Sequence, residues 1–108
     1  MTSKRIVIAE TIAESGLDRL RAAGFEVDIQ LDKTPTEMYE ILRGAQGLIV
    51  RSATMVDAAM LKAGSDLVVV ARAGVGLDNI DVEAATTQGV MVVNAPQSNV
   101  LSAAEHTM

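Results

Sequence analysis

The sequence predicts an α/β fold: a doubly wound, mainly parallel five-stranded sheet in the flavodoxin-like order 2-1-3-4-5, with helices on both faces. Two observations lead to this fold class. Short apolar runs alternate along the chain with segments whose apolar residues recur at helical spacing. In addition, the runs at residues 67–71 (LVVVA) and 90–95 (VMVVNA) do not alternate with polar residues, which is typical of parallel strands covered on both faces. Right-handed crossovers between such strands give a doubly wound sheet.

The first half of the chain predicts two strands and two helices. Residues 5–9 (RIVIA) form a short β-branched run, and residues 15–24 (SGLDRLRAAG) have an apolar helical face that ends at a glycine. Residues 25–31 (FEVDIQL) alternate apolar and polar, as in a strand with one wet face. The helix at residues 34–44 (TPTEMYEILRG) begins with a threonine–glutamate capping box and has proline at its first position.

The second half predicts three more strands and two complete helices. Each of these helices begins at an aspartate, which is favoured at N-caps, and ends at a glycine. The strands are expected at residues 47–51 (GLIVR), 67–71 and 90–95, and the helices at residues 57–64 (DAAMLKAG) and 81–89 (DVEAATTQG).

The end of the chain predicts one more helix, which is incomplete. Ser102 and Glu105 form a second capping box, but no stop signal follows before Met108. A helix with a start and no stop favours a larger protein cut short; the alternative is a natural end at which the helix frays.

The composition excludes several classes of function. The chain has a net charge of −5 and only two aromatic residues, so it lacks the basic surface and stacking rings of a nucleic-acid-binding protein. No apolar run approaches the ~20 residues of a membrane span, and the early acid Glu10 argues against a secretory signal peptide. With no cysteine and one histidine, the sequence shows no metal-ligand spacing. We expect a cytoplasmic protein that binds no metal, no nucleic acid and no membrane.

Two predicted loops that open with an arginine form a candidate anion site. In a parallel sheet, ligands bind outside the carboxyl ends of the strands. Arg51 and Ser52 close one strand, and a guanidinium beside a hydroxyl can hold a carboxylate or a phosphate. The alternative is an arginine that extends to water and pairs with Asp57.

The second loop is the stronger candidate. Arg72 comes just before residues 74–76 (GVG), and two glycines let successive backbone N–H groups turn inward around an anion. The alternative is an ordinary glycine-containing turn. We expect Asp78 and Asn79 to fix the turn rather than to touch a ligand.

Two polar residues near the end of the chain have weaker claims to function. Asn99 could face the same cleft, but an amide near a helix start also serves as a cap. His106 lies one turn into the last helix, and we interpret it as structural. The turn GVGLDN lacks the third small residue of a dinucleotide-binding fingerprint, so we expect no dinucleotide site in this chain.

Three segments, GLIVRSATMVDAAML, VVVARAGVGLDNIDVEAAT and GVMVVNAPQSNVLSAAEH, resemble the N-terminal part of NAD-dependent D-2-hydroxyacid dehydrogenases. The likeness runs from Ile6 to the end of the chain, and RSAT together with RAGVGLDNID resembles the phosphoglycerate branch of the family. It implies that residues 1–98 are a substrate-binding domain and that residues 99–108 lead into an absent nucleotide-binding domain. The family's catalytic residues and NAD site belong to that absent domain, so we expect no catalytic residue here and no tight binding of NAD.

The resemblance also implies which residues line the cleft between the two domains. Those near the substrate are Arg51, Ser52, Arg72, Gly74, Val75 and Gly76, and the one near both substrate and nicotinamide is Asn99. The N–H groups of the glycine loop would bind the substrate carboxylate. Arg72 would add positive charge near the phosphate.

The implied reaction is the oxidation of 3-phosphoglycerate to 3-phosphohydroxypyruvate in L-serine biosynthesis, with NAD as the hydride acceptor. The chain alone is expected to be inactive, and apolar surface left bare by a missing segment would favour a homo-oligomer. Two alternatives stay open. One is a free-standing anion-binding or dimerisation module of the same lineage, and the other is a dehydrogenase for another 2-hydroxyacid such as glycerate.

Overall fold

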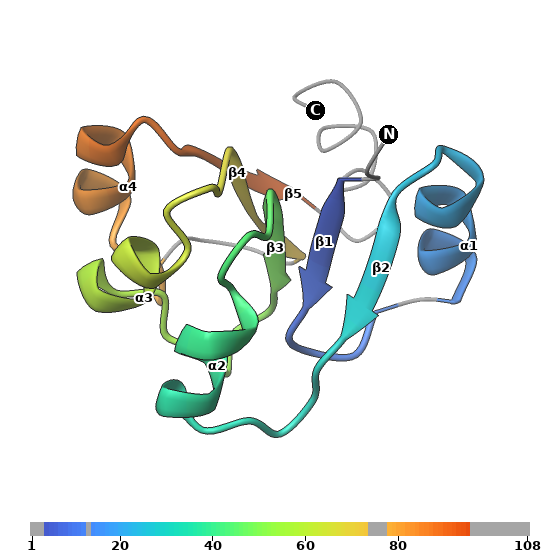
Figure 1. Ribbon diagram of the computed structural model, residues 1–108, viewed down its shortest axis with the longest axis horizontal. Coiled ribbons are helices and arrows are strands. Elements are labelled where there is room, and N and C mark those ends of the chain that lie inside the picture. Colours follow the sequence, from blue (N-terminus) through green and yellow to red (C-terminus); the bar gives the residue numbers. More distant parts are fainter. Residues whose placement is uncertain (1–3, 13, 74–77, 96–108) are drawn as a thin grey trace.

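The computed structural model describes residues 4–12, 14–73 and 78–95 of the chain. In these residues strands and helices alternate, starting with a strand (Figure 1). The strands are β1 (Arg5–Ile8), β2 (Glu26–Ile29), β3 (Gly47–Val50), β4 (Val69–Ala73) and β5 (Met91–Ala95), and the helices are α1 (Glu14–Ala22), α2 (Pro35–Ile41), α3 (Ala58–Ala63) and α4 (Val82–Gln88).

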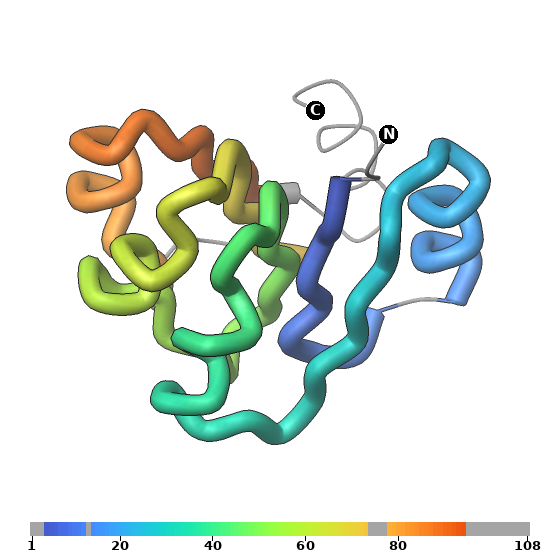
Figure 2. Tube along the Cα trace, in the orientation of Figure 1, coloured from blue at the N-terminus to red at the C-terminus, as the bar shows by residue number. Residues whose placement is uncertain are grey.

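These five strands are all parallel and form one sheet in the order β2-β1-β3-β4-β5. The predicted fold class and strand order are therefore confirmed. Parallel pairing gathers the carboxyl ends of the strands at one edge, which is the lower edge of the sheet in Figure 1. The trace in Figure 2 shows the connection from β2 to α2 running along that edge.

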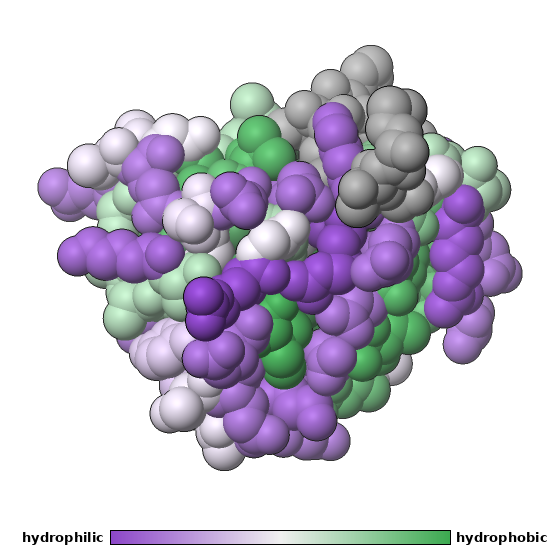
Figure 3. Space-filling model, viewed as in Figure 1, coloured by the Kyte–Doolittle hydropathy of each residue, from purple (hydrophilic) through white to green (hydrophobic). Residues whose placement is uncertain are grey.

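Helices cover both faces of the sheet, and each face has its own apolar cluster. On one face, Leu17 and Leu20 of α1 pack against strand residues that include Ile49. On the other face, α2, α3 and α4 pack over a larger cluster that includes Leu48 and Val70. The central strand β3 is buried along its whole length. Figure 3 shows that hydrophilic residues predominate on the surface turned to the viewer, with apolar residues visible between them.

Strand β4 differs from its prediction. It begins at Val69 rather than Leu67 and extends through Arg72 to Ala73. Pairing with β5 explains the extension, because Arg72 pairs with Asn94 and Ala73 pairs with Ala95. Arg72 therefore lies within the strand and not in the loop that follows it.

The structure does not describe the end of the chain beyond residue 95. The predicted domain boundary at residue 98 and the predicted helix at residues 99–108 lie outside them, and both stay predictions. Among the helices that the structure does describe, none is long and apolar enough to cross a membrane.

Three helix starts that the sequence predicts are confirmed. The Glu37 N–H donates to Thr34 Oγ1 at 3.2 Å, and the Thr34 N–H donates to Glu37 Oε1 at 3.0 Å, which completes the capping box of α2. Asp57 and Asp81 accept first-turn N–H groups of α3 and α4. Two hydrogen bonds lower the pKa of the Glu37 carboxyl because they favour its ionised form. The bond from the Thr34 backbone has the larger effect, and the bond with the Thr34 hydroxyl has the smaller one.

Truncation of a central strand residue tests the larger core. Leu48 is 0% exposed on β3, and we expect Leu48→Ala to lower the free energy of unfolding by about 3 kcal/mol through lost burial and a cavity. Leu31→Ala is the matched control, because Leu31 is 39% exposed and its truncation should cost less than about 1 kcal/mol. Urea unfolding followed by far-ultraviolet circular dichroism measures both values. Equal losses would contradict the assignment of Leu48 to the core.

The capping box predicts a pH dependence of stability. Because the pKa of Glu37 is lower in the folded chain than its usual 4.5, its contribution is fully present above that value and is lost as the pH falls through the lowered pKa. We expect the difference in unfolding free energy between the wild type and Glu37→Gln to be constant above about pH 5 and to shrink on acidification. Urea unfolding at a series of pH values measures it, with Glu26→Gln as a control that removes an exposed carboxylate and no cap. A difference that does not vary with pH would refute the prediction.

Candidate functional site

The loop between β3 and α3, residues 51–56, lies at the centre of the edge where the strands end. The strand before it, β3, has β1 on one side and β4 on the other. The loop begins with Arg51 and Ser52, which are both exposed, and ends with Val56, which is buried. It therefore presents two predicted site residues to solvent between two neighbouring βα loops.

A single carboxylate accepts hydrogen bonds from three backbone N–H groups of this loop. Glu10, which follows β1, accepts hydrogen bonds from the backbone N–H groups of Arg51, of Ala53 at 3.1 Å and of Thr54 at 3.2 Å. Sequence reasoning gave Glu10 no such role. The available signal was an acid placed directly after a buried strand, at the edge where the loops gather.

An amide from the opposite side holds the carbonyl groups of the same loop. The Asn79 side chain, in the loop after β4, donates to the Arg51 carbonyl at 2.6 Å and to the Thr54 carbonyl at 2.7 Å. Asn79 is 6% exposed, and an isolated parallel bridge joins Val56 to Ile80 beside it. The expectation that Asn79 fixes its own turn stays a prediction, because residues 74–77 of that turn lie outside the described residues; the described bonds of the Asn79 side chain go to the neighbouring loop.

The two predicted arginines lie at the ends of neighbouring strands. Arg72 pairs in register with Val50, the residue before Arg51. The Arg51 guanidinium is exposed, and within the described part of the chain its one contact is a long 3.4 Å bond that it donates to the Thr11 carbonyl. The alternative pairing of Arg51 with Asp57 is not found, because the Asp57 carboxylate caps α3 instead.

Arg72 has a side-chain donor that binds none of the described residues. The residue is half-buried, and its Nε lies out of contact with solvent without a hydrogen-bond partner among the described residues. Arg72 lies on the same face of β4 as Val70, since side chains alternate along a strand. A buried guanidinium N–H without an acceptor is unfavourable, so an anionic acceptor beside it would be stabilised.

Several predicted residues lie outside the described part of the chain. They are Gly74, Val75, Gly76, Asn99 and His106, and the roles given to them stay predictions. Within the described part, no group of three or more histidine, cysteine, aspartate or glutamate side chains is arranged to hold a metal ion.

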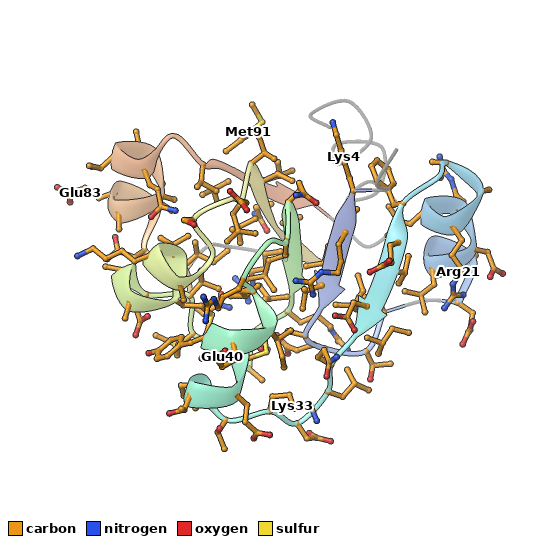
Figure 4. All side chains as sticks on the ribbon, in the orientation of Figure 1. Lys4, Arg21, Lys33, Glu40, Glu83 and Met91 are labelled. Atoms are coloured by element: carbon orange, nitrogen blue, oxygen red, sulfur yellow. The ribbon has the colours of Figure 1, made fainter. Side chains whose placement is uncertain are left out.

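A pocket of about 360 Å³ lies beside this site, between the loops that follow β1, β2 and β3 and the helices α2 and α3. Met38, Tyr39 and Met60 contribute apolar lining. Its ionisable residues are Glu10, Asp32, Lys33, Tyr39 and Asp57, so three carboxylates oppose one lysine. Figure 4 shows Lys33 at the lower edge of the molecule, in the connection between β2 and α2. This charge disfavours an anion in the pocket, which contains none of the predicted site residues.

Comparison with known proteins gives one consistent family. The family described as "D-isomer specific 2-hydroxyacid dehydrogenase, catalytic domain" matches residues 6–107. A D-3-phosphoglycerate dehydrogenase of Mycobacterium leprae is 49% identical over 105 residues, which are 95% of this chain and 19% of that protein. One from Archaeoglobus fulgidus is 40% identical over 104 residues, which are 96% of this chain and 20% of that protein.

A solved structure agrees with these relatives. The NAD⁺-bound 3-phosphoglycerate dehydrogenase of Entamoeba histolytica superposes with a TM-score of 0.78 at 34% identity, covering 88% of this chain and 33% of that one. The chain thus spans about a fifth of the length of the curated relatives it matches.

Removal of the Asn79 amide tests its part in the loop. We expect Asn79→Ala to lower the free energy of unfolding by about 2 kcal/mol, because two backbone carbonyls lose a buried donor. Gln88→Ala is the matched control: the Gln88 amide donates to the Leu61 carbonyl at 2.7 Å from an exposed residue, so water can replace it and the loss should stay below about 1 kcal/mol. Urea unfolding measures both, and a loss for Asn79→Ala no larger than the control would exclude this role.

Proposed function

The chain belongs to the D-isomer specific 2-hydroxyacid dehydrogenases, and from that premise we propose that it is the substrate-binding part of an enzyme that oxidises 3-phosphoglycerate to 3-phosphohydroxypyruvate. The observation that carries this proposal is the pair of arginines at the ends of β3 and β4: Arg51 is exposed, and Arg72 has a buried donor that meets no acceptor among the described residues. The names of the relatives support the choice of substrate, because those in Mycobacterium leprae and Archaeoglobus fulgidus are D-3-phosphoglycerate dehydrogenases.

The contribution of this chain to the reaction is to hold and orient the substrate. In the proposed arrangement, the N–H groups of Gly74, Val75 and Gly76 bind the carboxylate, and Arg51 and Arg72 attract the phosphate. Contacts at both ends of a three-carbon acid fix the direction of its C2–H bond. Positioning of this kind can supply a large part of a rate enhancement, but only when the group that accepts the hydride is in place.

The described residues do not fit a dinucleotide. The loop after β1 has no glycine-rich turn. Its acid, Glu10, already accepts hydrogen bonds from three backbone N–H groups of the neighbouring loop. A carboxylate in this position would also repel a pyrophosphate. We therefore assign NAD and the catalytic residues to another domain of the enzyme, and Asn99 to the junction with it.

Two ligands separate the proposed substrate from its alternatives. We expect 3-phosphoglycerate to bind the 108-residue chain more tightly than D-glycerate. Both Arg51→Ala and Arg72→Ala should weaken the binding of the phosphorylated ligand only, by about tenfold, because each removes one charge-assisted hydrogen bond. Chemical-shift titration of the ¹⁵N-labelled chain measures the four dissociation constants and those of the wild type.

The matched control is Arg21→Ala. Arg21 is an exposed arginine of α1 that pairs with Asp18 and lies on the far side of the molecule from α2 (Figure 4). Its removal should leave both affinities unchanged. Equal affinities of the wild type for the two ligands would favour a dehydrogenase of another 2-hydroxyacid, and no binding of either would favour a module with a different ligand.

A further inference from the structure

The backbone of Arg51 is fixed at both of its polar groups, although the residue is exposed. Its N–H donates to the Glu10 carboxylate, and its carbonyl accepts from the Asn79 amide at 2.6 Å. These two side chains come from the loops after β1 and β4, which lie on either side of β3 in the sheet. An exposed loop residue does not need such support merely to reach water.

The bonds also have a consistent direction across the loop. The Glu10 carboxylate accepts hydrogen bonds from the N–H groups of Arg51, Ala53 and Thr54, which lie 41 to 44 residues further along the chain. Asn79 donates to the carbonyls of Arg51 and Thr54. The N–H groups thus face one neighbouring loop and the carbonyls face the other, which fixes the peptide planes on both sides of Ser52.

Glu10 fixes the arginine without neutralising it. Three N–H donors share the Glu10 carboxylate, and among the described residues no ion pair joins Arg51 to an acid. The guanidinium has one long contact, to the Thr11 carbonyl at 3.4 Å. The backbone that carries the guanidinium is therefore held in a defined place, and no described acid neutralises its charge.

We infer that Glu10 is a positioning residue for the proposed phosphate contact of Arg51. The inference rests on the proposed function, because it concerns the same site. A carboxylate is required at this position, since all three of its partners are N–H donors. Glutamine has nearly the same shape, but its NH₂ group would face donors, so Glu10→Gln releases part of the loop at constant size.

The test is a double-mutant cycle in the 108-residue chain. The variants are Glu10→Gln, Arg51→Ala and the combination of the two, each titrated with 3-phosphoglycerate and with D-glycerate by chemical shift. We expect Glu10→Gln to weaken 3-phosphoglycerate binding about as much as Arg51→Ala, roughly tenfold. The combined variant should be no weaker than Arg51→Ala alone, because Glu10 then has no arginine to position. Binding of D-glycerate should not change.

The outcomes separate this inference from the proposed function. If Arg51→Ala does not weaken 3-phosphoglycerate, the proposed phosphate contact fails and the positioning role fails with it. If Arg51→Ala weakens it but Glu10→Gln does not, only the positioning role is overturned. Losses that simply add would show that Glu10 acts independently of Arg51, and equal losses for D-glycerate would show a role in stability alone; either result overturns the positioning role. Glu14→Gln, an exposed acid of α1, is the matched control and should change neither affinity.

A second measurement needs no variant and therefore holds even if Glu10→Gln fails to fold. In the wild-type chain, the amides of Arg51, Ala53 and Thr54 should exchange with deuterium more slowly than the amide of Ser52, which lies between them and is not bound by Glu10. Heteronuclear spectra recorded after dilution into D₂O give the four rates. Equal rates for the four amides would overturn the inference.

Discussion

One carboxylate, that of Glu10, sets the path of the loop on which the proposed anion site depends. A parallel sheet brings its βα loops to one edge, but the backbone groups of those loops have left the ladder and need other partners. In the loop after β3, three N–H groups bind Glu10 and two carbonyls bind the Asn79 amide. Side chains from the two flanking loops thus replace the ladder, and the loop follows their geometry.

This edge of the sheet has one region with arginines and a neighbouring region with carboxylates. Arg51 and Arg72 stand at the ends of β3 and β4, whereas Glu10, Asp32 and Asp57 line the pocket beside them. A chain with a net charge of −5 repels anions at long range, and salt screens that repulsion beyond about 8 Å. Attraction must therefore come from donors in contact with the ligand. The acidic lining of the pocket disfavours an anion there, so an anion bound to this edge would favour the two arginines.

The parts of this structure that depend on local contacts were predictable from the sequence. The Thr34 capping box and the N-caps Asp57 and Asp81 involve residues three apart, and each was placed correctly. The strand order followed from unbroken apolar runs and right-handed crossovers. The roles of Glu10 and Asn79 were not predictable in the same way, because their contacts span 25 to 44 residues and depend on which strands become neighbours. The predicted end of β4 at residue 71 is two residues short of the observed Ala73 for the same reason: its partner on β5 decides where pairing stops.

A site built on an exposed loop gains most when its conformation is set before the ligand arrives. Ordering a free loop and a long side chain on binding costs conformational entropy, and affinity falls accordingly. Here the Arg51 backbone is already held at its N–H and its carbonyl, so that binding at the proposed site would have to order only the side chain. A reaction that transfers hydride tolerates little misplacement of its substrate. In the proposed enzyme this constraint would extend beyond the residues that touch the ligand, since a chain that kept Arg51 but lost Glu10 would lose the hydrogen bonds that fix the Arg51 loop.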